Sequence, residues 1–564
     1  MRTTRAARTL QAVRTLQAVS AARASVRGHW PFVVILSAGL ALRVLTEVAY
    51  RPALLYIDSA KYLVSSGGTA PEGYQVLLRL LDPIGGLALV AAVQHAFGLA
   101  MAIALYALLL RRGAPRWAAT LAAAPVLLDA YQLQLEQTIM PDVLFETMIA
   151  AGLLLLLWPR RPGTASQPGT ARRPGTASQP GTARRPGPAK RMEPAKRIEP
   201  ASGTAGRWPV VAGTLLLGAA TTVREIGGVL IVPAVVFALL ATSGGRRRAA
   251  MAALATACFM LPVLGYMTAA YFVTGHFGLA SNGPTPEYGR AAAAADCGTL
   301  EIPADERALC PSPGETLALG GIDGLLHNPR SPGHTVPLPP GTTRQRLLEG
   351  FSLAVFRQQP LRVGASVARD SIRLFALTRD GDPEITSIAR WQFQVFYPTY
   401  PHRYTMAVFT RLARDHGSDG DLVAIEPAAT VLRDYQLGGG YTPGPMYAVG
   451  LAAGLLGSLT GLARRRTAED RELAVACLLV TLAAVVLLLS SDAFEFSWRY
   501  QLPAVVMLPA AGALGLTAVA PRVSRAKARA KDLTAARIPT GGTGRRTRPA
   551  SAESGPRAPA GRTG

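Results

Sequence analysis

Carboxylates and arginines that flank long apolar stretches are the residues of this chain best suited to chemistry. Charge at the edge of a bilayer is costly, so such side chains usually line a cavity or have a partner. The acids are Asp58, Glu136 and Asp142, and the arginines are Arg224 and Arg499. A fixed carboxylate accepts a proton or holds a divalent cation, and a guanidinium binds a phosphate through two hydrogen bonds. These residue types suit a site that binds a phosphate and activates a hydroxyl.

The first carboxylate, Asp58, lies in the segment YIDSAKYL directly after an apolar stretch. Tyr56, Lys61 and Tyr62 flank it, and Tyr74 follows in the short motif EGY. A carboxylate fixed among these side chains suits catalysis or ligand binding. An aspartate at the start of a helical turn also satisfies unpaired backbone amides. The segment therefore fits a catalytic carboxylate and a helix N-cap equally.

The next two acids lie six residues apart in the segment LEQTIMPDVLFE. Asp142 directly follows Pro141, which predicts a first-turn acid that complements a helix dipole. No helix terminus accounts for Glu136 in the same way, so a site role is its main interpretation. Glu146 lies one turn below Asp142 and requires a partner, because a carboxylate at that depth is costly.

Two arginines complete the set. Arg224 adjoins Glu225 between two apolar stretches, so it either forms an interfacial ion pair or faces a lipid phosphate. Arg499 and Tyr500 lie in the segment FEFSWRYQLP, before the last apolar stretch. Trp498 and Tyr500 fit an aromatic belt at a membrane surface. Arg499 suits the phosphate of a lipid-linked donor.

His95 follows Gln94 within a long apolar stretch. A histidine in that setting is more often a packed, hydrogen-bonded helix residue than a ligand, and substrate binding is the alternative. The sequence holds no zinc, P-loop, dinucleotide-binding or nucleophile-elbow motif. The metal is unknown on this basis, although the carboxylates admit a divalent cation.

Apolar stretches of membrane-spanning length must position these side chains. The chain has 564 residues, of which 49% are hydrophobic and 17% charged, and this composition favours lipid as the solvent. We therefore predict an all-α polytopic membrane protein of about ten transmembrane helices. They are expected near residues 30–50, 84–110, 117–133, 139–158, 208–223, 226–243, 250–273, 444–463, 472–491 and 501–520.

The net charge of +24 is unevenly distributed along the chain. Most of the 59 lysine and arginine residues lie in the two termini, in one linker and in short clusters between apolar stretches. Alternating the helices from a cytoplasmic N-terminus puts every basic cluster on the cytoplasmic side, as the positive-inside rule requires. The arginines have no interleaved aromatic residues, so we expect no nucleic-acid binding. We expect a multi-pass plasma-membrane protein with both termini in the cytoplasm.

Repeats and shifts in composition divide the chain into segments. The stretch RRPGTASQPGTA occurs twice in tandem in a linker that is too rich in Pro, Gly and Arg to bury a core. The predicted organisation is a basic cytoplasmic N-terminus at 1–29, transmembrane helices 1–4 with an acidic first outer loop at 30–158, a disordered cytoplasmic linker at 159–207, transmembrane helices 5–7 at 208–273, an extracytoplasmic loop region at 274–440, transmembrane helices 8–10 at 441–520, and a disordered basic tail at 521–564.

The extracytoplasmic loop region is too long to be a simple connection. Leu347, Phe351 and Val355 have helical spacing on an apolar face, as do Val363 and Val367, which predicts interfacial helices on the membrane surface. The Gly- and Pro-rich part from 281 to 340 reads as irregular. Its two cysteines, Cys297 and Cys310, either close a local disulfide or stay free.

The pattern of these motifs resembles the GT-C superfamily of membrane glycosyltransferases, which includes protein O-mannosyltransferases and lipid A aminoarabinose transferases. The features that carry it are Asp58 in the first outer loop, Glu136 and Asp142 in the second, Arg224 in VREIGGVLIVP, and Arg499 with Tyr500 before the last helix. Their order and the long loop after the seventh helix match as well. The resemblance spans roughly residues 30–520.

The resemblance implies transfer of a sugar from a polyprenyl-phosphate carrier to a glycan, lipid or protein acceptor on the extracytoplasmic face. It implies that Asp58 is the general base or supports a metal, with Glu136 and Asp142 as secondary acids and Arg224 and Arg499 as phosphate contacts. This chain has one acid in its first loop instead of an adjacent acidic pair, which puts metal dependence in doubt.

Two other functions fit the same residues. A transporter or flippase for a lipid-linked sugar would show internal repeat symmetry and broken helices near mid-membrane, and we find no such symmetry in the sequence. A structural protein of the cell envelope would tolerate neutralisation of Asp58, Glu136 and Arg499 together. The enzyme is the main prediction, and membrane lipids are its expected surroundings.

Overall fold

A computed structural model describes residues 28–64, 70–158, 207–280, 285–379, 381–399, 405–418, 421–463 and 467–520. The predicted basic N-terminus, the repeat linker and the basic tail lie outside the described residues, apart from residues 28, 29 and 207. All the elements considered below belong to one compact unit.

Each of the ten apolar stretches is helical, but the third, predicted at 117–133, is broken at Asp129, after which α5 (Ala130–Gln137) begins. Six helices are long and apolar enough to cross a membrane, among the described residues: Gly28–Ala49, α3 (Gly73–Arg111), α9 (Gly245–Thr274), α18 (Gly444–Ala463), α19 (Ala468–Asp492) and α20 (Leu502–Val519). The other four are shorter: α4 (Arg116–Leu128), α6 (Asp142–Leu157), α7 (Trp208–Thr221) and α8 (Ile231–Ala241). The protein is an all-α membrane protein, and the number of ten spans stays a prediction.

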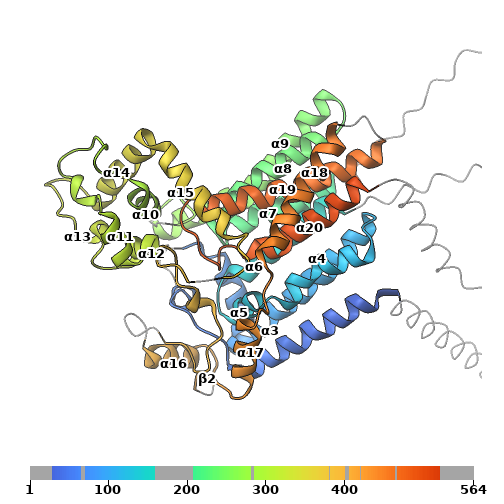
Figure 1. The fold of residues 1–564 in the computed structure, drawn as a ribbon, viewed down its shortest axis with the longest axis horizontal. Helices are drawn as coiled ribbons and strands as arrows, with labels where there is room; N and C mark the ends of the chain where they lie inside the picture. Colours follow the sequence, from blue (N-terminus) through green and yellow to red (C-terminus); the bar gives the residue numbers. More distant parts are fainter. Residues whose placement is uncertain are drawn as a thin grey trace, which may run out of the picture. The chain divides into compact units, whose positions relative to one another are not determined.

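Small residues bring the last three apolar helices close together. In Figure 1, α18, α19 and α20 lie side by side, and each packs against the other two. A Cβ atom at Gly450 would lie 2.5 Å from the backbone oxygen of Leu508, and one at Gly457 would lie 2.5 Å from the Cα of Gly515. Small residues at such contacts are typical of helix packing in membranes, because they let backbones approach.

Helix α3 begins earlier than its apolar stretch predicted and contains a kink. Pro83 lies inside it, and the backbone leaves the helical region at Gly85 and Gly86. Gly86 has φ 60°, and a Cβ atom there would lie 2.8 Å from the backbone oxygen of His416. The positive φ and this close approach both require glycine at the kink.

The loop region at 274–440 is largely helical and has its own core. Among its described residues it contains α10 (Thr285–Ala294), η3 (Arg307–Leu309), α11 (Pro313–Leu319), α12 (Gly321–His327), α13 (Pro332–Thr335), α14 (Arg344–Gln358), α15 (Pro360–Arg373), η4 (Ile388–Trp391), α16 (Met406–Asp415) and α17 (Ala428–Leu437). The two strands of a short antiparallel ladder, β1 (Tyr50–Arg51) and β2 (Val423–Ala424), join this region to the first outer loop. The expectation that residues 281–340 are irregular is therefore wrong.

The amphipathic pattern in this region is confirmed as helical, but its two helices face different surroundings. Phe351 and Val355 of α14 are fully buried against Tyr288 and Leu325 in the core of the loop region, so this face does not lie on a membrane. In α15, by contrast, Leu361 is 87% exposed and Ile372 is 67% exposed. The helix instead turns Ser366 and Asp370 inward, where both accept hydrogen bonds from the buried guanidinium of Arg290. Cys297 and Cys310 form a disulfide, with their Cα atoms 6.0 Å apart.

Candidate functional site

Arg499 brings together two carboxylates that are far apart in the sequence. Its Nη1 donates to Asp58 at 2.8 Å, its Nε donates to Asp142 at 3.1 Å, and its Nη2 lies 3.0 Å from the same Asp142 carboxylate. Arg224 donates to the same Asp142 carboxylate, and Lys61 lies 2.9 Å from the other oxygen of Asp58. We call these five residues the Arg499 cluster. Four of them come from separate segments that the sequence pattern assigned to one site: Asp58, Asp142, Arg224 and Arg499. The fifth, Lys61, flanks Asp58 in the sequence.

The side chain of Asp58 does not cap a helix. Asp58 precedes the short helix α2 (Ser59–Leu63), but its carboxylate makes no capping hydrogen bond. The hydroxyl of Ser59 instead accepts a hydrogen bond from the backbone N–H of Tyr56. The carboxylate is therefore available to Arg499 and Lys61, and the N-cap interpretation of Asp58 is wrong.

Asp142 does occupy the first turn of α6, as its position after Pro141 predicted. Its side chain is 2% exposed and lies between the two arginines. Arg224 directly precedes η2 (Glu225–Leu230) in an extended conformation. Glu225 is exposed, and within the described residues it forms no ion pair within 4.0 Å. The alternative of an Arg224–Glu225 ion pair is therefore wrong.

Aromatic rings from the loop region and the last loop cover the arginines. The guanidinium carbon of Arg499 lies 5.5 Å from the ring centroids of Trp391 and Tyr500, and that of Arg224 lies 4.9 Å from the Tyr500 ring. The ring of Tyr56 packs on Trp391 at 4.7 Å. Cations over aromatic faces are held by the ring quadrupole. Tyr500 thus contacts the site and is more than a membrane-belt residue.

The sequence interpretation missed the loop-region residues beside the site. Arg390 pairs with Asp323 at 2.8 Å and lies 3.4 Å from the Tyr56 hydroxyl. Trp391 follows Arg390 in η4. The adjacent arginine and tryptophan were the available signal, but nothing in the local sequence places η4 against the first outer loop.

The Arg499 cluster carries a net positive charge. Burial alone would raise the pKa of Asp58, but the charges of Arg499 and Lys61 lower it well below its usual range. Burial lowers the pKa of Arg499, and Asp142 and Asp58 outweigh this effect and raise it. Three cations and two carboxylates therefore leave one positive charge. Lys61 is 44% exposed, Asp58 24% and Arg224 20%, so this charge is accessible from one side.

A cavity of about 290 Å³, open solvent included, adjoins the cluster. Asp142, Arg224 and Tyr500 form its polar end, and Phe145 and Leu487 are among its apolar walls. The polar end and the apolar wall together suit an amphipathic ligand whose head group is an anion.

Glu136 and His95 belong to a separate, sealed cluster. One carboxylate oxygen of Glu136 accepts a hydrogen bond from Arg43 at 2.7 Å, and the other lies 2.8 Å from Nδ1 of His95. Gln132 donates to Glu136 at 3.1 Å and to Glu146 at 2.9 Å, which provides the partner that Glu146 requires. We call these residues the Glu136 cluster; all are at most 4% exposed. His95 is therefore a packed, hydrogen-bonded helix residue in this structure.

The Glu136 cluster connects the two outer loops that carry the site carboxylates. Gln94 donates to the backbone oxygens of Glu136 and Thr138 at 2.8 and 2.9 Å. The backbone of Leu54 then hydrogen-bonds Gln137 and Ile139 on either side of Thr138. Leu54 lies four residues before Asp58, and Ile139 lies three residues before Asp142. These bonds fix the distance between the two loops.

Tyr62 and Tyr74 lie between the two clusters. Their rings pack edge to face with centroids 5.5 Å apart, and the Tyr74 hydroxyl donates to Gln94 at 2.9 Å. Burial raises the pKa of the Tyr62 hydroxyl, so it stays protonated and can act as a hydrogen-bond donor. Both tyrosines support the geometry of the Arg499 cluster from the side of α3.

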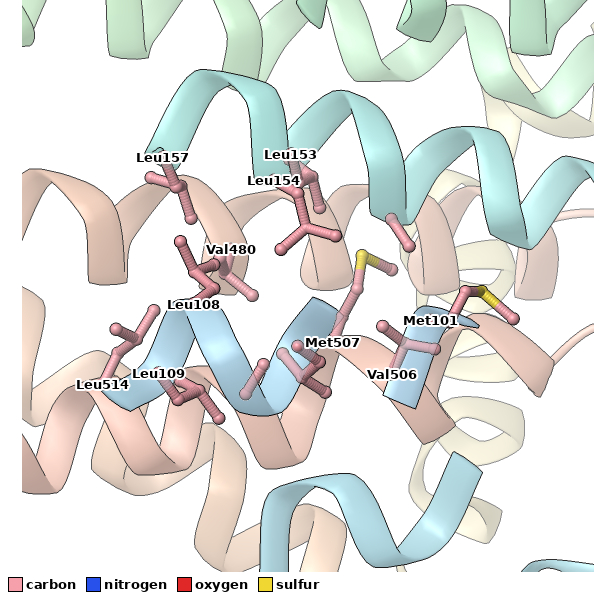
Figure 2. Close-up of a pocket in the computed structure, with 13 residues that line it drawn as sticks. Met101, Leu108, Leu109, Leu153, Leu154, Leu157, Val480, Val506, Met507 and Leu514 are labelled. Carbon is pink, nitrogen blue, oxygen red and sulfur yellow. The ribbon is translucent and has the colours of Figure 1, made fainter. Parts of the chain in front are cut away.

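An apolar pocket of about 400 Å³, open solvent included, lies among α3, α6, α19 and α20 (Figure 2). Its lining includes Met101 and Leu108 of α3, Leu153 of α6, and Met507 and Leu514 of α20. Helices α6 and α20 both start next to the Arg499 cluster and line this pocket further along. Such a lining suits contact with hydrocarbon.

Among the described residues, no three His, Cys, Asp or Glu side chains gather closely enough to hold a metal ion. Asp58 and Asp142 both contact Arg499 instead. The chemistry proposed for this site uses no metal ion.

Comparison with solved structures finds weak similarity to two enzymes. For the oligosaccharyltransferase AglB from Archaeoglobus fulgidus, in complex with an inhibitory peptide and a dolichol-phosphate, the identity is 13% and the TM-score 0.39, over 90% of this chain and 52% of that chain. For the S. cerevisiae protein O-mannosyltransferase Pmt1-Pmt2 complex bound to the sugar donor, the identity is 13% and the TM-score 0.28, over 46% of this chain and 36% of that chain.

The chain spans about half the length of the archaeal structure. No family model and no curated protein sequence matches it. The evidence for a function therefore comes from the site's own residues.

Proposed function

We propose that this protein is a membrane glycosyltransferase that moves a sugar from a polyprenyl-phosphate carrier to an acceptor on the extracytoplasmic face. The observation that carries the proposal is the convergence of Asp58, Asp142, Arg224 and Arg499 at one partly exposed cluster. A polyprenyl-phosphate sugar is a phosphodiester with one negative charge, which matches the single positive charge of the cluster.

The arginines are assigned to the phosphate. Arg224 is 20% exposed at the polar end of the cavity, so one of its faces is available to a ligand oxygen. Arg499 is more buried and holds both carboxylates. Two guanidinium groups beside the leaving phosphate would stabilise the second negative charge that develops when the bond to the sugar breaks.

The carrier chain is assigned to the apolar side of the site. The cavity at Arg224 has apolar walls, and α6 and α20 lead from the cluster to the larger apolar pocket of Figure 2. A lipid with a polar head and a long hydrocarbon tail would place its phosphate at Arg224 and its tail among these helices.

Asp58 is assigned to the reacting sugar. It stays ionised beside Arg499 and Lys61, because both cations lower its pKa. An ionised carboxylate next to the anomeric carbon would stabilise the positive charge of the transition state. The sugar and the acceptor, whether glycan, lipid or protein, would be selected by the shape of the site.

Purified protein in detergent, incubated with a panel of radiolabelled polyprenyl-phosphate sugars and an extract of the cells that make the protein as the source of acceptor, tests the proposal. The expected result is transfer of the sugar from one donor to an acceptor with release of polyprenyl phosphate, and the same release with and without chelator would show independence of a divalent cation. A flippase would bind the donor and leave its sugar–phosphate bond intact. No release from any donor, in protein that binds one of them, would favour the flippase.

A further inference from the structure

A second carboxylate lies next to the Arg499 cluster without being part of it. Glu495 belongs to the segment between α19 and α20, four residues before Arg499, and is 6% exposed. Its Oε1 accepts a hydrogen bond from the Thr386 hydroxyl. Within the part of the chain that the structure describes, no cationic nitrogen lies within 4.0 Å of Glu495, whereas Asp58 and Asp142 each pair with two cations.

The surroundings of Glu495 favour its neutral form. Burial raises its pKa, and the charge of Asp323 adds to this effect. The Thr386 hydroxyl and the charges of Arg390 and Arg499 only partly offset the rise, so the pKa is about 7. Burial, and to a smaller extent the charge of Glu495, raises the pKa of the Tyr500 hydroxyl, so this hydroxyl stays protonated.

Glu495 does not line the cavity at Asp142 and Arg224. It contacts the loop region instead, through Thr386. The same region provides Arg390, which lies 3.4 Å from the Tyr56 hydroxyl, and Trp391, whose ring lies 5.5 Å from the Arg499 guanidinium. Among the residues that the structure describes, the buried indole N–H of Trp391 has no hydrogen-bond partner, so a donor is left unsatisfied beside Arg499.

We propose that Glu495 is the group that accepts the proton from the acceptor hydroxyl, on a wall formed by Tyr56, Thr386, Arg390 and Trp391. This inference rests on the proposed glycosyl transfer. The acceptor oxygen forms a bond to the anomeric carbon, and its proton passes to a carboxylate oxygen of Glu495. The bond between the anomeric carbon and the phosphate oxygen breaks, and its electron pair stays on polyprenyl phosphate.

The two carboxylates then have different tasks because their environments differ. Asp58 is held ionised by two cations, which makes it a weak base. Glu495 binds a proton near neutral pH, which is where proton transfer is most efficient. A site with one permanently charged carboxylate and one exchangeable carboxylate can stabilise a cation and move a proton at the same time.

The Glu495→Gln variant tests this role, because glutamine keeps the shape and can still accept from Thr386. We expect kcat to fall by about 100-fold to 1,000-fold at saturating donor. The Kd for polyprenyl phosphate should stay within about twofold, since Glu495 does not line the cavity at Arg224. The wild-type kcat should rise with pH through an apparent pKa near 7, since the deprotonated form is the base, and this limb should be absent in Glu495→Gln.

Two further variants separate catalysis from folding. Glu495→Asp should recover part of the activity together with the pH limb. Asp492→Asn removes another buried carboxylate, at the end of α19, which contacts Ser371 and Gln501. This variant should leave the pH limb in place. An unchanged kcat or a retained pH limb in Glu495→Gln would overturn the role of Glu495 alone. A wild-type protein that binds the donor but releases no polyprenyl phosphate would overturn the proposed function and this inference together.

Discussion

The Arg499 cluster and the Glu136 cluster use the same kinds of side chain and differ in how they are enclosed. Each contains carboxylates bound by arginine. In the Glu136 cluster, Arg43 and Glu136 are at most 2% exposed and neutralise each other. In the Arg499 cluster, three side chains are at least 20% exposed, and one positive charge is left over. A cluster buried around one ion pair holds a structure together, whereas a partly exposed cluster with a surplus positive charge can bind an anion.

The difference explains why two sets of acids with similar positions in the sequence have different tasks. Glu136 belongs to the second outer loop, which Gln94 and backbone hydrogen bonds to Leu54 fix against the first outer loop. Asp58, Lys61 and Asp142 of the Arg499 cluster lie on these two loops. We therefore expect substitutions in the Glu136 cluster to change stability and substitutions in the Arg499 cluster to change donor binding and turnover.

The largest effect on turnover is expected for Asp58→Asn. This change removes the charge that holds Arg499 and Lys61 and that would stabilise the transition state. We expect transfer to fall by about 1,000-fold or more, with normal membrane insertion and abundance. The measurement is release of polyprenyl phosphate by purified protein. Unchanged release would show that the Arg499 cluster is as structural as the Glu136 cluster.

A smaller effect is expected for Arg224→Gln, which removes one guanidinium from the polar end of the cavity. A hydrogen bond to a charged group contributes about 1.5–3 kcal/mol, so the KM for the donor should rise by about 10-fold to 100-fold. Glu225→Gln is the matched control, because Glu225 is adjacent and exposed, and its KM should not change. Equal effects of the two variants would contradict the assignment of Arg224 to the phosphate.

For Glu136→Gln, we expect a loss of stability and little change in donor binding. The change leaves Arg43 buried without its anion, which costs about 3–5 kcal/mol in typical proteins. Thermal unfolding in detergent should show a lower Tm, while the KM for the donor in the folded fraction stays within about twofold. A large rise in KM with an unchanged Tm would show that Glu136 belongs to the substrate site.

The smallest effect is expected for Lys61→Gln. Lys61 is 44% exposed, and ion pairs with exposed partners are worth about 1 kcal/mol or less. We expect kcat/KM to fall by about two- to fivefold, and the difference from the wild type to shrink at high salt. A loss as large as that of Asp58→Asn would show that Lys61 itself contacts the donor.

Much of the Arg499 cluster could be predicted from the sequence, for a physical reason. Asp58, Asp142, Arg224 and Arg499 all flank apolar stretches, where a charge must find a partner, and their partners turned out to be one another. Glu136 was grouped with them by the same rule, because the sequence could not show that Arg43, inside the first apolar stretch, is its partner. The sequence around a single arginine in an apolar stretch does not indicate which carboxylate the arginine will pair with.

The loop-region side of the site could not be predicted. Arg390, Trp391 and Thr386 reach the site only through long-range packing of a region with its own core. Glu495 was visible in the segment FEFSWRYQLP, but its lack of a cationic partner follows from the position of Thr386. Local patterns predict helices and their ends, and they do not predict which loop covers which helix end.

The central claim is that the Arg499 cluster binds the phosphate of a lipid carrier, and direct binding of polyprenyl phosphate to purified variants tests it. Arg499→Lys keeps the charge and loses the paired hydrogen bonds, so we expect the Kd to rise by at least about 10-fold. Arg379→Lys is the control, because Arg379 is also a buried arginine. It pairs with Asp129 at 3.1 Å, neither residue belongs to the Arg499 cluster, and the Kd of this variant should not change. Equal Kd values for the wild type, Arg499→Lys and Arg379→Lys would contradict the account.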